Sequence, residues 1–510
     1  MRPVVSAGSV PILYAIGRTP LKRKFTAILL ALTLLFGFSA PAYAMPEEQS
    51  TAIQSFLEEA LGISRAPGIS VALLIDGETH VFSAGVANRE TESPADGDTL
   101  WELASVSKAF TALGLLYLEE QGLLSLSDSI ADHLPWFTLQ YGGQAVDMQG
   151  VRLYHLLYHT IGITNQRHPN PVLRGTVPDT LQDTVEAMID TELAFYPGER
   201  FEYGTLNYTI LGLVMEGASG QSYESFMEEQ IFSPLGLANT FANRDHAYET
   251  GRMSQGYATS FIFFTNPNDS PEARGSVPTG YIISSASDMA RWMNIQLGFV
   301  DDIPDIFYNI ITRSHQGDMS VPSNPFGGTY YVYAAGWLVS EDGAIIQHSG
   351  GNPGFATHVH MWPEEGLGIT FLSNVNHING YAVTNAVRGM LDGDVNPPYF
   401  ISAFQILDIA LTIVTVVGGL PALLLFLLGL RRITQEKRHR LTGKRFALIA
   451  ALGVITLSMG VLSFMLPSLL GVNWSLLFVY AFYSMLTGMI ALCLLCASAT
   501  WFVCAKTTIK

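Results

Sequence analysis

Three long apolar runs close the chain and constrain its fold more than any other feature. They cover residues 401–430, 446–470 and 473–503, and each exceeds the roughly 20 residues that cross a hydrocarbon core. Asp408 is the only acidic residue within them. Because channels and pumps place several charges inside the membrane, this composition argues against a transport role. We therefore expect three transmembrane helices, in a membrane domain 401–510, that anchor a separate domain.

Two independent signals predict one topology. The loop 431–445, "RRITQEKRHRLTGKR", holds seven Arg or Lys residues and one Glu, and the positive-inside rule places such a loop in the cytoplasm. The N-terminal stretch "LKRKFTAILLALTLLFGFSAPAYA" has a basic start, an apolar centre and a small-x-small end at Ala42-Tyr43-Ala44. It indicates a secretory signal peptide over 1–44, with an uncleaved anchor helix as the alternative. Residues 45–400 should then face the periplasm or exterior of a bacterial inner (cell) membrane.

The charge of the region 45–400 limits its partners. It holds 42 acidic residues against 13 basic ones, so it should repel nucleic acid and anionic lipid headgroups. Twelve of the 13 basic residues are arginine, and Lys108 is the only lysine.

Cys493, Cys496 and Cys504, the only cysteines, all lie in the last apolar run, so the region 45–400 has no disulfide. Cys493 and Cys496 have C-x-x-C spacing. Within an apolar helix, however, two such cysteines indicate packing residues rather than a redox or metal site.

The order of elements predicts an α/β fold for 45–400. Residues 46–62 have helical periodicity, and 66–88 form two apolar runs joined at Asp76-Gly77, a strong hairpin signal. Residues 115–290 mix helical segments with Gly- and Pro-rich loops, and short β-rich runs follow from 329. We expect one antiparallel sheet, built from N- and C-terminal segments and flanked by helices, with a helical insert.

The stretch "WELASVSKAF" places Ser105 three residues before Lys108. Residues three apart share a helix face, so the hydroxyl and the amine can meet. A lysine serves as a base only when burial or a nearby cation lowers its pKa, and the neighbouring residues here are largely apolar. Arginine cannot release a proton. A single lysine kept in a region that otherwise uses arginine therefore indicates proton transfer, against the alternative of an exposed lysine beside an ordinary serine.

Other catalytic signatures are absent from the sequence. It contains no G-x-S-x-G elbow and no H-E-x-x-H pair. His358 and His360 share a strand face and could suggest a metal, but the sequence places no third ligand. We expect no metal and no cofactor.

An ordered set of segments resembles the serine β-lactamase and penicillin-binding-protein superfamily, in the branch of class C β-lactamases, DD-peptidases and S12 peptidases. The resemblance covers about 48–380. The matching segments are "LWELASVSKAFTALGLLYLEEQG", "LLYHTIGIT" (156–164), "YPGERFEYGTLNYTILG" (196–212), "IFSPLGLANT" (231–240), "YIISSASDMARWM" (281–293) and "HSGGNPGF" (348–355).

The resemblance implies roles for individual residues. Ser105 would be the acylated nucleophile, Lys108 its proton acceptor and Tyr203 the second acid/base group. The backbone N–H groups of Ser105 and Gly351 would form the oxyanion hole. His348 would replace the commoner lysine of the third motif and tune the field of the pocket, while Gly350 and Gly351 would let substrate lie close to the strand.

One position departs from the family. Its Tyr-x-Asn motif is Tyr203-Gly204-Thr205 here, which weakens the reading as a β-lactamase or ordinary DD-peptidase. The departure and the architecture are similar to those of the membrane-anchored peptidases that mature colibactin-like prodrugs. In that group Asn352 would read a D-asparagine side chain, or would be a plain turn residue before Pro353. The implied function is removal of an N-acyl-D-asparagine cap from a nonribosomal peptide or polyketide product.

Alternatives stay open at this point. They are a DD-carboxypeptidase, class C β-lactamase-like enzyme or esterase acting on cell wall or lipid, and a non-catalytic receptor or scaffold that kept the fold. The expected partners are an acyl-D-amino-acid or peptide substrate and membrane lipid, with an exporter or a second copy of the chain as further candidates.

Overall fold

The computed structural model describes most of the chain after residue 44. The described residues are 45–168, 178–261, 264–268, 273–317, 331–394, 397, 402–434, 439–440, 442–469, 483–505 and 507–508. The predicted signal peptide lies outside them.

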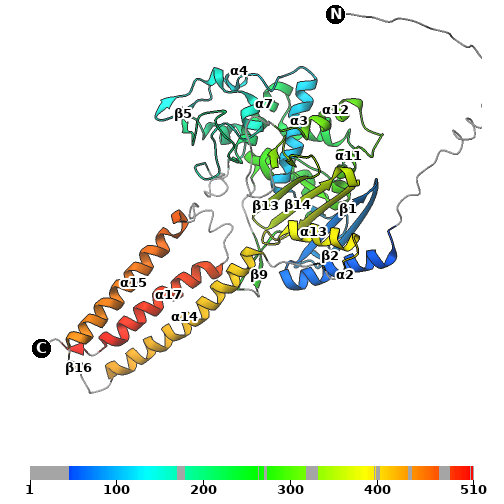
Figure 1. The fold of residues 1–510 in the computed structure, drawn as a ribbon. Helices are drawn as coiled ribbons and strands as arrows, with labels where there is room; N and C mark the ends of the chain where they lie inside the picture. The colour runs from blue at the N-terminus through cyan, green and yellow to red at the C-terminus, as the bar shows by residue number, and fades with distance from the viewer. Residues whose placement is uncertain are drawn as a thin grey trace, which may run out of the picture. The chain divides into compact units, whose positions relative to one another are not determined.

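An eight-stranded antiparallel sheet joins the two ends of the domain, as predicted (Figure 1). Its order is β11-β12-β13-β14-β15-β1-β2-β3, so the N-terminal hairpin pairs with the last C-terminal strand. The strands are β11 (Tyr331–Tyr333), β12 (Leu338–Ser340), β13 (Ile346–Asn352), β14 (Phe355–Trp362), β15 (Leu367–Ser373), β1 (Gly68–Ile75), β2 (Glu78–Asn88) and β3 (Ser93–Pro94).

The central strand β1 packs on both of its faces. Ile69, Val71 and Leu73 share a core cluster with helices α2 (Glu47–Ser64) and α13 (Gly380–Leu391). Ala72 and Leu74 point the other way, toward α3 (Ser107–Glu120) and α11 (Ala286–Gln296). Because side chains alternate along a strand, a strand covered on both sides is a nearly continuous apolar run, which explains "GISVALLI".

The hairpin predicted at Asp76-Gly77 is confirmed. Ile75 pairs with Glu78, which leaves a two-residue turn. Asp76 has φ 48° and Gly77 φ 90°, and positive φ at both positions is the signature of the hairpin turn that matches strand twist.

The insert contains small sheets as well as the expected helices. Its strand pairs are β5–β6 with β7, β8–β9, and β10 with β4. The strands are β4 (Leu100–Glu102), β5 (Leu139–Tyr141), β6 (Gln144–Ala145), β7 (Thr191–Glu192), β8 (Tyr257–Ser260), β9 (Phe264–Pro267) and β10 (Ile283–Ser285). The helices are α4 (Ile130–His133), α5 (Leu153–Leu157), α6 (Leu181–Glu186), α7 (Asn207–Ser219), α8 (Tyr223–Phe226), α9 (Arg244–Glu249) and α10 (Val277–Gly280); α12 (Asp305–Ser314) follows α11.

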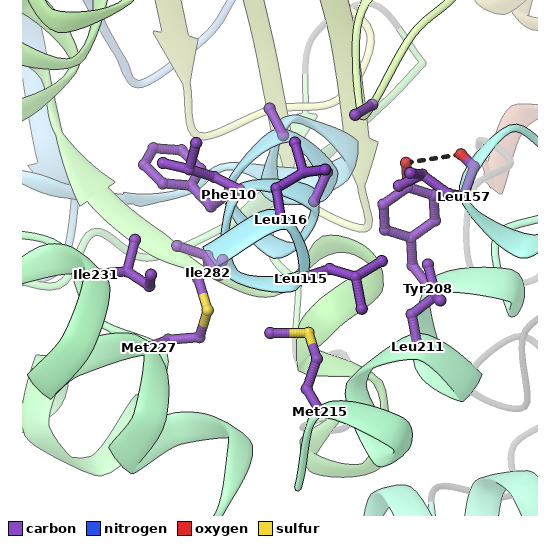
Figure 2. Close-up of a cluster of buried hydrophobic side chains, with 14 of the residues drawn as sticks. Phe110, Leu115, Leu116, Leu157, Tyr208, Leu211, Met215, Met227, Ile231 and Ile282 are labelled. Carbon is purple, nitrogen blue, oxygen red and sulfur yellow. Dashed lines mark hydrogen bonds between the residues drawn. The ribbon is translucent and has the colours of Figure 1, made fainter. Parts of the chain in front are cut away.

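Helix α3 is buried almost all round. Eleven of its fourteen residues are buried, as expected for a helix that is apolar on every side. Figure 2 shows Phe110, Leu115 and Leu116 of this helix among side chains of the insert, with Met215 and Met227 close by. Each fully buried aliphatic or aromatic side chain contributes about 1.5–3 kcal/mol. The helix that follows Ser105 is therefore held rigidly.

Three helices in the C-terminal region are long and apolar enough to cross a membrane, by length and composition. They are α14 (Ala403–Thr434), α15 (Gly443–Leu469) and α17 (Tyr483–Cys504). Helices α14 and α17 pack together: the Thr415 and Thr487 hydroxyls lie 3.2 Å apart, and the Ser484 hydroxyl donates to Asp408. The one acidic residue of the apolar runs thus has a hydrogen-bond partner on a neighbouring helix.

Gly336 gives a test of how tightly the sheet fits the buried helix. It has φ 81°, and a Cβ atom there would lie 2.4 Å from Ala109 Cα and 2.5 Å from Ala109 N. We expect Gly336→Ala to lower the free energy of unfolding by about 3 kcal/mol, because overpacking adds to the cost of positive φ.

Gly343→Ala is the matched control. Gly343 has φ 73°, but nothing lies within 4 Å of the Cβ position, so the change should cost only about 1 kcal/mol. Urea unfolding of both variants checks the difference, and equal costs would mean that contact with α3 is not limiting.

Candidate active site

Ser105 lies on a strained turn directly before α3. A 3-10 turn covers Ala104–Val106, and Ala104 has φ 47°, a conformation that costs a non-glycine residue about 1–2 kcal/mol. The N–H of Leu103 donates to Ile282 O at 2.9 Å, and Ile282 N–H donates to the Ser107 hydroxyl at 3.1 Å. Packing on both sides therefore holds a turn that the local sequence would not choose alone.

Lys108 is completely buried and faces Ser105. Its Nζ atom lies 3.2 Å from Ser105 Oγ and 2.5 Å from Thr279 O. The same Nζ atom lies 5.1 Å from the centre of the Tyr203 ring and 5.7 Å from that of Tyr208. Burial lowers the pKa of Lys108 from 10.5 to about 7. A large share of the amine is therefore unprotonated near neutral pH, as a proton acceptor requires.

Tyr203 extends from the loop that precedes α7, and Asn165 fixes the backbone that follows it. Its carbonyl accepts from Asn165 N–H at 3.2 Å, and Asn165 Oδ1 accepts from Thr205 N–H at 2.7 Å. Burial raises the pKa of the Tyr203 hydroxyl, and an interaction with the Ser105 hydroxyl opposes this in part. Tyr203 is consequently a neutral phenol over the physiological range and can pass a proton.

His348 lies near the same group on β13. Its Nδ1 atom lies 2.7 Å from Ser349 O, so Nδ1 carries the hydrogen and the buried Nε2 atom is an acceptor. Burial lowers the pKa of His348 to about 3, and the nearby Lys108 adds a smaller contribution in the same direction. The ring centre lies 6.3 Å from that of Tyr203. His348 is therefore neutral, unlike the lysine it was predicted to replace.

The two glycines of β13 have different surroundings. A Cβ on Gly350 would lie 2.5 Å from Leu103 O and 3.0 Å from Ser105 N, whereas nothing lies within 4 Å of the Cβ position of Gly351. Gly350 is thus needed for the close approach of β13 to the turn that carries Ser105. The open side of the strand is at Gly351, where the oxyanion hole is predicted.

Asn352 is buried and points toward Glu102. Its Nδ2 atom donates to Glu102 Oε2 and to Gly280 O, both at 2.7 Å. Glu102 also pairs with Arg244 at 2.5 Å. Both amide hydrogens of Asn352 are used by the protein, so Nδ2 has no hydrogen left to donate to a substrate.

The structure brings together most of the residues predicted from sequence. Lys108 lies between Ser105 and the Tyr203 ring, and His348 lies near Tyr203. Gly350 approaches Ser105, and Gly351 and Asn352 follow it on β13, while Thr205 follows Tyr203 in the sequence. Sequence reasoning missed Glu102, Thr279 and His159. The first is in the "WELA" segment and the last in "LLYHTIGIT", but only the fold shows what they contact.

The histidine pair on β14 is a packing feature. His358 Nδ1 bonds with the Ser349 hydroxyl at 2.7 Å, and His360 stacks on Trp362 with ring centres 3.8 Å apart. No group of three or more metal-ligating side chains is present among the described residues. The two rings are buried against each other rather than arranged around an ion.

The burial of Lys108 predicts a pH-dependent cost to stability. Below pH 7 the folded and unfolded states both hold the proton, whereas between about 7 and 10.5 only the unfolded state does. Stability therefore rises with pH in that window. In Lys108→Met this contribution is absent, so the stability of wild type relative to the variant should increase by about 3 kcal/mol between pH 7 and pH 9.5. Urea unfolding at both pH values checks this, and a constant difference would contradict the lowered pKa.

Comparisons with known proteins agree with this geometry. The sequence model of the Beta-lactamase family matches residues 53–392. Protein flp of Staphylococcus aureus (strain MW2) is 27% identical over 434 residues, which are 83% of this chain and 84% of that protein. Penicillin-binding protein 4* of Bacillus subtilis (strain 168) is 29% identical over 341 residues, or 61% of this chain and 69% of that protein.

Solved structures share the fold. The octameric penicillin-binding protein homologue from Pyrococcus abyssi has a TM-score of 0.60 and 25% identity, covering 71% of this chain and 81% of that one. A β-lactamase/D-alanine carboxypeptidase from Pseudomonas syringae has a TM-score of 0.56 and 21% identity, over 68% and 99% of the two chains. At that identity the second likeness shows the fold alone. The family match, which spans most of the domain that carries Ser105 and Lys108, shows that this chain is a serine hydrolase of the β-lactamase and penicillin-binding-protein family.

Proposed function

We propose that the protein is a membrane-anchored serine peptidase of the S12 type that removes an N-acyl-D-asparagine cap outside the cytoplasm. The observation that carries its peptidase chemistry is the buried Lys108 amine, 3.2 Å from Ser105 Oγ with a pKa of about 7. A hydroxyl beside such a base is an activated nucleophile.

The proposed mechanism follows from the positions of the groups. Neutral Lys108, with Tyr203, takes the Ser105 proton while Oγ forms a bond to the substrate carbonyl carbon. The backbone N–H groups of Ser105 and Gly351 hold the oxyanion. Tyr203 then passes the proton to the leaving nitrogen as the C–N bond breaks. Water hydrolyses the acyl-serine ester and releases the acyl-D-asparagine with a restored Ser105 hydroxyl.

The polar groups behind the nucleophile support the choice of substrate. Asn352 Nδ2 is fixed by Glu102 and Gly280, which leaves Oδ1 to accept a hydrogen from a carboxamide. Thr205 supplies a hydroxyl where the wider family has an amide. Both groups can form hydrogen bonds with an uncharged substrate. The carboxamide of a D-asparagine side chain has a donor for Asn352 Oδ1 and an acceptor for the Thr205 hydroxyl.

The neutrality of His348 also supports an uncharged acyl unit. A substrate that ends in D-Ala-D-Ala carries a carboxylate, which a cation at the third motif would attract. Here that position is a histidine with a pKa of about 3, so it offers only an acceptor nitrogen. A carboxypeptidase would need another cationic residue to bind the carboxylate of its substrate.

The proposed setting is a bacterial inner membrane. Helices α14, α15 and α17 would anchor the peptidase, and the basic loop 431–445 would lie in the cytoplasm. Membrane lipid would contact the apolar helices, and an exporter or a second copy of the chain would be a further partner. The acidic domain would then face the exterior, where nucleic acid is not a partner.

A cell-wall carboxypeptidase is the second candidate, because the family match is equally consistent with it and a penicillin-binding protein is among the relatives at 29% identity. Such an enzyme would also acylate Ser105. The two candidates differ in the acyl unit that Ser105 accepts, so the choice can be made by substrate.

Mass spectrometry of the purified full chain separates these candidates. We expect turnover of an N-myristoyl-D-asparaginyl amide, at least tenfold slower turnover of the L form, and little turnover of a D-Ala-D-Ala peptide. Equal turnover of the two enantiomers would contradict the proposed cap. Preferred cleavage of the D-Ala-D-Ala peptide would favour the carboxypeptidase.

Ser105→Ala is the control for this assay. The change removes the nucleophile but leaves the buried Lys108, so hydrolysis and acyl-enzyme formation should both disappear. If the variant kept its activity in the cell, a receptor or scaffold role would be the better interpretation.

The pKa of Lys108 predicts the pH dependence of acylation. Because the unprotonated amine is the base, the single-turnover acylation rate should rise about tenfold from pH 6 to pH 8 and then level off. Rapid-quench measurement of the acyl-enzyme mass checks this. A rate that stays constant over this range would show that Lys108 is not the group that takes the proton.

A further inference from the structure

His159 makes contacts on both sides of Tyr203. It follows α5, is fully buried and has φ 55°. Its carbonyl accepts from Glu202 N–H at 3.1 Å, and its Nδ1 atom accepts from Gly204 N–H at 3.4 Å. The peptide N–H groups immediately before and after Tyr203 therefore both end on one residue.

Further contacts fix the imidazole itself. Asn207 Nδ2 lies 2.9 Å from Nδ1, at the start of α7. The ring centre is 4.4 Å from that of Tyr203 and 4.5 Å from that of Tyr333. Since two N–H donors point at Nδ1, the neutral ring must carry its hydrogen on Nε2. Protonation of Nδ1 would set it against both donors.

The electrostatic surroundings keep this tautomer. Burial lowers the pKa of His159 well below 6.5, and the neighbouring Lys108 and His348 lower it further. The acceptor at Nδ1 is therefore available over the whole range in which Lys108 titrates. His159 does not itself reach the Ser105 hydroxyl by any hydrogen bond among the described residues.

We propose that His159 is a positioning residue that holds the Tyr203 phenol where it can protonate the leaving nitrogen. The inference rests on the role of Tyr203 in the proposed function. The left-handed backbone at His159 brings both its carbonyl and its ring to the 202–204 segment, so one residue limits the rotation of the loop that carries the phenol. A displacement of about 1 Å in a catalytic group can cost about 100-fold in rate.

Two substitutions at this position separate acceptor from bulk. His159→Leu removes the acceptor and leaves the N–H groups of Gly204 and the Asn207 side chain unpaired. His159→Asn keeps an oxygen acceptor close to the Nδ1 position, and asparagine tolerates positive φ better than most residues. The asparagine variant should therefore behave like wild type, and the leucine variant should not.

The readout is the ratio of amide to ester hydrolysis by the full chain in detergent. The substrates are the p-nitrophenyl ester and an alkyl amide of one N-acyl-D-asparagine. A p-nitrophenolate leaves without a proton, whereas an amine needs one from Tyr203. In His159→Leu we expect kcat for the amide to fall about 100-fold, kcat for the ester to fall less than about tenfold, and KM to change little. His159→Asn should recover the amide rate to within about fivefold of wild type.

Asn207→Asp covers the case in which the leucine variant does not fold. It is nearly the same size but turns a donor into an acceptor opposite Nδ1, so the ring must carry a hydrogen on Nδ1 and lose its bond from Gly204. The amide-to-ester ratio should fall here too. Equal losses for both substrates in folded variants, or an asparagine variant no better than leucine, would overturn the inference.

Failure of the proposed substrate would look different. It would appear in wild type, as a lack of preference for D- over L-asparagine. The ratio of amide to ester hydrolysis could then be compared between the variants with an amide and an ester of the acyl group that the enzyme does accept. That comparison would still test the role of His159.

Discussion

The burial of one amine against one carbonyl organises this candidate active site. Lys108 donates to Thr279 O from inside a helix that is covered on nearly every side. The carbonyl fixes the direction of the amine, and the absence of water lowers its proton affinity. Ser105, Tyr203 and His348 are then arranged around a base whose strength is set by packing rather than by a neighbouring charge. The hydrophobic core in Figure 2 therefore helps to set the pKa of Lys108.

Much of the fold could be predicted from sequence because local residue patterns determine it. The Asp76-Gly77 turn, the apolar β1 run and the short strands after 329 each carry their own signal, and the sheet that joins them follows. The small strands of the insert were not predicted, because they are two to four residues long. Such strands are too short to show the alternation of apolar and polar residues that marks a strand. The sequence "TYYVYAAGWLVS" (329–340) shows one continuous β-rich run, whereas Gly336, between β11 and β12, separates two strands in its described part.

The proximity of the motif residues was predictable where their own side chains meet: Ser105, Lys108 and Tyr203 lie close together as expected, and their catalytic roles stay predictions. Residues that act through distant partners were not predictable: Thr279 contributes only a carbonyl, and Glu102 matters because Asn352 reaches it across 250 positions. The charge state of His348 could not be predicted from its place in the motif. Burial and the nearby Lys108 lower the pKa of the imidazole and keep it neutral.

The pairing of β1 with β15 has a consequence for how the chain is made. Ile69 lies opposite Ser373, and Ile75 opposite Leu367, so the most apolar strand of the sheet lacks one neighbour until some 300 further residues have been synthesised. Until then its open edge can pair with any other strand. A chain interrupted anywhere in the insert would keep that edge exposed, and helix α2 would cover only one face of it. The protein therefore depends on late C-terminal segments to protect its earliest strand, which makes completion of the sheet, rather than formation of the N-terminal hairpin, the step at which the domain becomes soluble.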